Sequence, residues 1–164
     1  MKVLCLLLAL STPAFAGEIP ATALDDPASF AGADVVALGE IHDNPMHHAY
    51  QARAVAALRP SALVFEMLTA EQAARMPETL PDAATLAATL QWNAQGWPDF
   101  ALYYPIFAAA PAARVYGAEI PRDIARKAFD TGIAAQFGPE AAAYGLTTPL
   151  APADQSAREA EQLA

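Results

Sequence analysis

The chain has 164 residues, of which 18 are acidic and 9 are lysine or arginine, and its formal charge is −9 at pH 7. This length suits one domain with a hydrophobic core. The acidic balance excludes the electrostatic pattern of a nucleic-acid-binding protein and disfavours binding to anionic membranes.

The first 16 residues have the pattern of a secretory signal peptide. Lys2 supplies a positive start, Val3 to Leu10 is a short apolar run, and Ala14-Phe15-Ala16 has the small-x-small pattern of a cleavage site. The run is shorter than the roughly 20 residues that a membrane-spanning helix needs. We therefore expect a signal peptide at 1–16 and an exported domain at 17–164 that is periplasmic or secreted. An uncleaved N-terminal anchor is the alternative.

Cys5 is the only cysteine, and it lies inside the apolar run of the expected signal. A lipoprotein would carry its cysteine after that run, preceded by small residues, so the sequence does not predict a lipoprotein. The exported domain is then expected to have no disulfide and to depend on an ordinary hydrophobic core.

Three short apolar runs are predicted to be strands: Asp34–Glu40, Ala62–Met67 and Arg114–Glu119. They lack polar alternation, as expected for a parallel sheet covered by helices on both faces. The segment Pro45–Leu58 is helical in composition and ends before Arg59-Pro60, which predicts a right-handed βαβ unit. The fold class is therefore α/β, with a parallel β-sheet flanked by helices.

A long segment, at about residues 69–112, separates the second and third predicted strands. Thr69 and Gln72 have the spacing of a capping box, and Asp82–Trp92 repeats apolar residues at helical spacing. We expect this insertion to form a small α-helical lid over the ligand edge of the sheet, where insertions often carry binding residues.

The C-terminal part is predicted to be helical. Pro121 is placed to begin a helix that ends at Gly132, and a last helix is expected from about Pro152. This last pattern reaches Ala164 without a glycine, a proline or a basic last turn. We expect the domain to continue beyond Ala164, and the 164-residue chain to be poorly soluble or only partly folded because apolar surface is left uncovered. A frayed terminal helix is the alternative.

All three histidines lie in one stretch of ten residues, 39–48, directly after the first predicted strand. In an extended turn, Glu40 and His42 can point the same way and form part of a metal site or an acid–base pair. His47 and His48 lie in the first turn of the following helix, where neighbours are rotated by about 100°, so only one can face a given spot. This concentration predicts a cofactor or metal role, against the ordinary alternative of turn caps and surface groups.

Glu40, Glu66 and Glu119 each end a predicted strand, so we expect three carboxylates to converge on one edge of the sheet. Like charges raise one another's pKa, and a metal, another cation or Arg122 would relieve the cluster. The alternative is that each glutamate marks the point where a strand meets water. The candidate metal ligands are Glu40, His42, His47 and Glu66.

The insertion carries four aromatic residues close together: Trp97, Tyr103, Tyr104 and Phe107. For Trp97 and Phe107, packing inside the lid is the preferred interpretation. A tyrosine beside a planar apolar cofactor can have a further role, because a phenolate can hold haem iron. Apolar, aromatic pocket walls suit such a ligand.

The sequence Val36-Ala37-Leu38-Gly39-Glu40-Ile41-His42-Asp43-Asn44-Pro45, followed by His47-His48, resembles the opening signature of the ChaN-like haem-binding proteins. These form a branch of the superfamily that includes Tiki proteases and erythromycin esterases. The resemblance covers the chain from about Asp34. Weaker matches follow in the same order as in the family: Phe65-Glu66-Met67, Gly96-Trp97-Pro98, Tyr103 with Pro105-Ile106-Phe107, and Ile120-Pro121-Arg122.

The resemblance implies a parallel sheet between helices with a small helical lid, a chain longer than this one, tyrosine ligation of haem and cofactor-mediated dimers. Tyr103 fits the family's tyrosine position best, with Tyr104 or a ligand beyond the given segment as alternatives. The chain departs from the family pattern in two ways. Many family members are lipoproteins, whereas this chain lacks the cysteine for lipid attachment. Glu119 stands where a neutral residue, often asparagine, is expected. The other candidate cofactor-binding residues are His42, His47, His48 and Arg122.

The leading hypothesis is an exported haem-binding protein, rather than an enzyme, that takes part in haem or iron acquisition or handling. Its expected partners are haem and an outer-membrane haem receptor or transport system, with a homodimer as one assembly and no nucleic acid. The competing hypothesis is a metal-dependent hydrolase of the Tiki or erythromycin-esterase type. In that enzyme Glu40 and His42 would be catalytic, and a divalent metal would lower the pKa of bound water. A third hypothesis is a scaffold that binds neither group.

Overall fold

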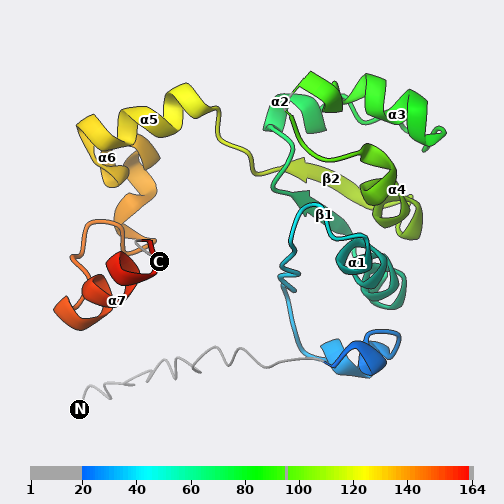
Figure 1. Ribbon diagram of the computed structural model, residues 1–164, viewed down its shortest axis with the longest axis horizontal. Helices are drawn as coiled ribbons and strands as arrows, with labels where there is room; N and C mark the ends of the chain where they lie inside the picture. Colours follow the sequence, from blue (N-terminus) through cyan, green and yellow to red (C-terminus); the bar gives the residue numbers. More distant parts are fainter. Residues whose placement is uncertain (1–19, 95, 163–164) are drawn as a thin grey trace, which may run out of the picture. The chain divides into compact units, whose positions relative to one another are not determined.

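The computed structural model describes residues 20–94 and 96–162 (Figure 1). It is mainly helical, with one parallel sheet of two strands, β1 and β2, in the described residues. This agrees with the predicted α/β class. In chain order the elements are η1 (Ala21–Ala23), η2 (Pro27–Phe30), α1 (Pro45–Leu58), β1 (Ala62–Phe65), α2 (Ala70–Ala73), α3 (Ala83–Thr89), η3 (Trp92–Ala94), α4 (Phe100–Ala109), β2 (Arg114–Gly117), α5 (Arg122–Thr131), α6 (Ile133–Phe137), η4 (Pro139–Ala142) and α7 (Pro152–Gln162).

The chain forms two compact units. The first contains the described residues up to Ala62 together with Pro77–Arg114, and it holds α1, α3 and α4. The second contains Leu63–Met76 and the described residues from Val115 onward, and it holds nearly all of the strand pair and α5 to α7. The expected signal peptide at 1–16 lies outside the described residues. No helix in the described part of the chain is long and apolar enough to cross a membrane.

Helix α1 begins and ends where the sequence predicts. The side chain of Asn44 accepts a hydrogen bond from the backbone N of Met46 (3.0 Å), and Pro45 occupies the first helical position, where no N–H is needed. The helix ends at Leu58, and Arg59 then adopts a left-handed conformation (φ 47°) before Pro60.

The core of the first unit forms where α1 packs against α4. The buried residues of each helix recur at spacings of three and four, so each helix presents one face to the other. Asp99 caps the start of α4 by accepting from the backbone N of Ala101 (2.9 Å). Complete burial of a large side chain such as Phe107 stabilises the fold by about 2 kcal/mol. The buried residues of the two helices are His48, Gln51, Ala54, Val55, Phe100, Tyr103, Ile106 and Phe107.

In the second unit, β1 and β2 run side by side (Figure 1). Leu63 and Phe65 are buried, whereas Val64 between them is 67% exposed, so one face of β1 is uncovered in the described residues. The sequence predicts a strand buried on both faces, and the structure differs. Gly117, the last residue of β2, lies directly against the backbone of Leu68. An added Cβ would lie 2.2 Å from the carbonyl oxygen of Leu68, so only glycine fits there without a shift.

The predicted strand at Asp34–Glu40 is wrong for the described residues. The segment is extended but belongs to no sheet, so the predicted βαβ unit is not formed. No backbone hydrogen bond joins residues 35–39 to another described segment, and the side-chain Nε2 of Gln51 donates to the carbonyl of Leu38 instead (3.2 Å). Val36 and Leu38 are half-buried in this segment, whereas Val35 is 85% exposed, so the run is neither paired in a sheet nor buried as a whole among the described residues.

Other predicted elements are confirmed. The capping box forms: the backbone N of Thr69 donates to Gln72 Oε1 (2.9 Å), and the backbone N of Gln72 donates to Thr69 Oγ1 (3.1 Å). Asp82 caps α3, α5 ends at Gly132, and α7 begins at Pro152. Two short elements in the connection before α7, α6 and η4, were not predicted.

Candidate functional site

A tight turn directly precedes α1 and carries Glu40 and His42. The backbone N of Asn44 donates to the carbonyl of Ile41 (2.9 Å), and the backbone N of Ile41 donates to His47 Nδ1 (2.8 Å). The first turn of α1 is thereby tied back to the extended segment. This local geometry fixes the backbone from which both side chains project.

The carboxylate of Glu40 is the centre of a buried hydrogen-bond network. Its side chain is only 8% exposed, and its Oε1 accepts from His42 Nδ1 (2.7 Å) and from the Tyr103 hydroxyl (2.9 Å). His48 Nδ1 lies 3.3 Å from the other oxygen, Oε2. Residues of the turn, α1 and α4 therefore meet at one carboxylate.

Opposing effects set the charge state of Glu40. Burial alone raises the pKa of this carboxyl, but hydrogen bonds from His42 and Tyr103, the nearby amide of Gln51 and the electrostatic attraction of His48 together hold the pKa below its ordinary value. Glu40 is therefore ionised at neutral pH and can only accept hydrogen bonds. It follows that His42 Nδ1 donates the proton of this hydrogen bond, and the ring presents its other nitrogen, Nε2, away from Glu40.

His42 is the accessible member of the network. Its side chain is 38% exposed, and in the described part of the chain no protein group bonds to its Nε2. Its ring also contacts Trp97 edge to face, with ring centroids 4.9 Å apart. An imidazole held at Nδ1 by a carboxylate, with Nε2 open, is the arrangement in which histidine ligates a metal.

Trp97 reaches His42 through a short loop between η3 and α4. The indole N–H of Trp92 donates to the carbonyl of Pro98 (2.8 Å), and Gly96 adopts a positive φ of 76°, which glycine tolerates without strain. The Nε1 of Trp97 is buried and has no hydrogen-bond partner among the described residues. The sequence predicted packing for Trp97 and gave no signal of this contact with His42.

The two candidate tyrosines have different surroundings. Tyr103 is 0% exposed, its ring packs on His48 (4.3 Å between centroids) and Trp92 (4.7 Å), and its hydroxyl also lies 3.3 Å from the carbonyl of His42. Tyr104 donates to the carbonyl of Pro81 (2.9 Å). For Tyr103 to ligate haem iron, its hydroxyl would have to leave Glu40.

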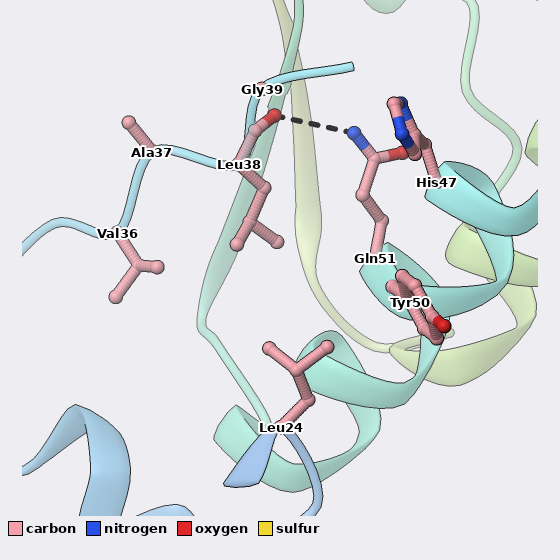
Figure 2. A pocket seen from close by; sticks show the side chains of 8 residues that line it. All are labelled: Leu24, Val36, Ala37, Leu38, Gly39, His47, Tyr50 and Gln51. Carbon is pink, nitrogen blue, oxygen red and sulfur yellow. Dashed lines mark hydrogen bonds between the residues drawn. The ribbon is translucent and has the colours of Figure 1, made fainter. Parts of the chain in front are cut away.

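His47 and His48 point to different places, as the helical geometry predicts. His48 is 1% exposed and its Nε2 bonds the carbonyl of His42 (2.9 Å), so this ring belongs to the network around Glu40. His47 lines a groove of about 270 Å³ between the extended segment and α1 (Figure 2). The groove residues are Leu24, Val36, Ala37, Leu38, Gly39, His47, Tyr50 and Gln51.

This groove is small for a tetrapyrrole. Figure 2 shows Gln51 reaching from α1 to the carbonyl of Leu38 across one side of it. Pockets that enclose drug-sized ligands usually measure about 300–1,000 Å³. The groove by itself therefore does not identify a haem pocket.

Glu66, Glu119 and Arg122 lie in the second unit. Glu66 is exposed just after β1, and Arg122 is exposed at the start of α5. Glu119 Oε2 is buried without a hydrogen-bond partner among the described residues, and no ion pair joins Glu119 to Arg122 there. The convergence of these carboxylates with Glu40 stays a prediction.

The structure gives no support for a divalent metal. Within residues 20–94 and 96–162, no group of three or more histidine, cysteine, aspartate or glutamate side chains could hold a metal ion. Glu40 and His42 lie together, but His47 bonds the backbone of Ile41 instead of joining them. The hydrolase hypothesis is not favoured for this reason.

A family model described as haem-binding uptake, Tiki superfamily, ChaN matches residues 27–164. The chain belongs to this family. The match includes the turn with Glu40 and His42 and both compact units, and it confirms the family predicted from the opening signature. Neither the curated proteins nor the solved structures gave a match.

The residues of the site fit the cofactor that the family handles. Haem iron is held in proteins by axial ligands that include a histidine nitrogen. His42 offers such a nitrogen, and Trp97 places an aromatic surface beside it. The site offers one open imidazole nitrogen, with a carboxylate bonded to the opposite ring atom. One protein ligand suits an iron that a porphyrin already coordinates better than it suits a metal ion that needs several protein ligands.

Proposed function

We propose that this chain is an exported haem-binding protein of haem or iron acquisition, and that Nε2 of His42 ligates the iron. The observation that carries the proposal is the 2.7 Å hydrogen bond between His42 Nδ1 and Glu40, which orients the ring and leaves Nε2 open. When bound, haem would supply an iron centre that can take a ligand from the protein. His42 would hold the iron, while Glu40 fixes the orientation of its ring and Trp97 contacts the ring edge to face.

His42 is favoured over the other candidates because of what each already binds. His48 is buried and its Nε2 bonds the carbonyl of His42, and the Tyr103 hydroxyl bonds Glu40. His47 accepts the backbone N–H of Ile41 at Nδ1, so its proton is on Nε2, and His47 would have to give up this hydrogen bond to ligate iron. Of the four groups, only His42 combines an open nitrogen with a carboxylate at the opposite ring atom.

Haemin titration tests the proposal. The chain should give a saturable shift of the haem absorbance band at one haem per chain, with the spectrum of histidine-ligated iron. His42→Ala should abolish that spectrum, whereas His47→Ala, which removes the neighbouring imidazole and its bond to the backbone of Ile41, should weaken haem binding but keep the type of spectrum. No saturable shift above that of an unrelated acidic protein would overturn haem binding, and loss of the spectrum only in His47→Ala would move the ligand to His47.

Export and uptake need their own tests. The N-terminal pattern at 1–16 supports export, so mass spectrometry of the protein recovered outside the cytoplasm should show a chain that begins at Gly17.

Deletion of the gene should slow growth when haem is the only iron source. A pull-down with the haem-loaded chain should recover an outer-membrane receptor or transport component, and sedimentation with and without haem tests the family's cofactor-mediated dimer.

A further inference from the structure

We infer that Tyr103 is a positioning residue that acts through Glu40 to fix the ring orientation and the tautomer of His42. The part of this inference that concerns iron rests on the proposed function, whereas the part that concerns the imidazole does not. Tyr103 would then affect the iron without touching it.

The hydroxyl of Tyr103 contacts both ends of the Glu-x-His motif. Its hydroxyl lies 2.9 Å from Glu40 Oε1 and 3.3 Å from the carbonyl of His42. Glu40 and His42 are two residues apart, and both accept from a single group that belongs to a different helix. The turn is therefore held from outside as well as by its own hydrogen bonds.

Tyr103 is itself held rigidly. It is completely buried, and its ring packs on His48 and Trp92 at centroid distances of 4.3 and 4.7 Å. A glutamate side chain has three rotatable bonds, and a carboxylate without fixed partners would sample several orientations. The fixed hydroxyl selects the orientation in which Oε1 also faces His42 Nδ1.

The consequence for His42 is chemical as well as geometric. A carboxylate that accepts from Nδ1 keeps the proton on that atom, so Nε2 keeps its lone pair. The same carboxylate makes the ring a stronger electron donor, which would strengthen a bond from Nε2 to iron and would favour ferric over ferrous iron. Such partners of a metal-bound histidine typically contribute about 10–100-fold in affinity.

The first experiment uses the 164-residue chain without haem. Two-bond ¹H–¹⁵N NMR correlations report which nitrogen of His42 carries the proton. The unchanged chain and Tyr104→Phe should both show the Nδ1–H tautomer alone, because Tyr104 donates elsewhere. Tyr103→Phe should show a mixture of tautomers. If Tyr103→Phe, still folded, keeps the pure Nδ1–H tautomer, the inference is overturned.

The second experiment uses the haem-loaded chain. Tyr103→Phe should keep the histidine-ligated spectrum but release haem to an excess of a haem acceptor about 10–100-fold faster, whereas Tyr104→Phe should not. Glu40→Gln should raise the midpoint potential of the iron, because an amide pulls less strongly on the Nδ1 proton. A phenolate-type spectrum that disappears in Tyr103→Phe would overturn the inference by making Tyr103 the ligand.

The two experiments separate this inference from the proposed function. If the unchanged chain binds no haem, the proposed function fails, and the NMR comparison alone still decides whether Tyr103 positions His42. If haem binds through a residue other than His42 or Tyr103, and the tautomer of His42 still depends on Tyr103, the positioning role is supported and only the ligand assignment is wrong.

Discussion

The hydroxyl of Tyr103 and the carboxylate of Glu40 lie 2.9 Å apart, although 63 positions separate them in the sequence. The hydroxyl comes from the middle of α4, and the carboxylate from the turn before α1. Their contact ties the packing of the two helices to the geometry of the candidate ligand, so changes at Tyr103 should affect both stability and ligation.

Tyr103→Phe should lower the free energy of unfolding by about 1–3 kcal/mol, because it removes a hydrogen bond to a buried ionised group. Denaturant unfolding of the haem-free chain measures this loss. Tyr104→Phe provides the matched comparison, since its hydroxyl donates to a neutral carbonyl, that of Pro81, and should cost less. Equal losses in the two variants would show that the charge of Glu40 gives the Tyr103 bond no added strength.

Acid should destabilise the fold through Glu40. Its pKa lies below the ordinary value of about 4.5 in the folded state, so the unfolded chain binds a proton first as the pH falls. The stabilisation that ionised Glu40 gives the fold is complete above about pH 4.5. It is lost as the pH falls through the lower pKa that Glu40 has in the folded state. Glu40→Gln should be less stable than the unchanged chain at neutral pH, and the gap should narrow in acid. A gap that is independent of pH would contradict this.

Gly117→Ala should destabilise the second unit by about 3 kcal/mol, at the upper end of the usual cost of such a clash, because the new Cβ would lie 2.2 Å from the backbone carbonyl oxygen of Leu68. Gly39→Ala is the control, since nothing lies within 4 Å of its added Cβ. Thermal unfolding of the two variants should differ clearly. Similar melting temperatures would mean that β2 can shift away from Leu68.

The two tryptophans should respond differently to replacement by phenylalanine. Trp92→Phe loses the bond from Nε1 to the carbonyl of Pro98 in a side chain that is 1% exposed, which should cost about 1–3 kcal/mol. Trp97→Phe removes an N–H without a partner among the described residues, so it should cost less stability. It should instead shift the haem absorbance band, because Trp97 contacts His42. An unchanged spectrum would place haem away from this contact.

Local signals in the sequence were sufficient for most helices. The start of α1 depends on Asn44 and Pro45, and the start of α2 depends on Thr69 and Gln72, so each was predictable from adjacent residues. The strand at Asp34–Glu40 failed because an apolar run shows that a segment is partly buried but not what it lies against. In the structure its neighbour is a side chain of α1, Gln51.

The candidate site was predictable in part. The spacing of Glu40 and His42 indicated that they act together, and they form a 2.7 Å hydrogen bond. The contacts of Tyr103 with Glu40 and of Trp97 with His42 depend on how α4 and the loop before it pack, which no local pattern reports. The family's tyrosine position brought Tyr103 to attention, but not its partner.

The distance in sequence between Glu40 and Tyr103 also bears on when the site can exist during folding. Closing a loop of this length costs conformational entropy before any contact is gained, so the pairing is expected to form only once α4 has docked on α1. A partly synthesised or unfolded chain would then have the Glu-x-His turn but not the hydroxyl that holds it. Under the proposed function, chains that have completed this packing would release haem more slowly than unfinished chains.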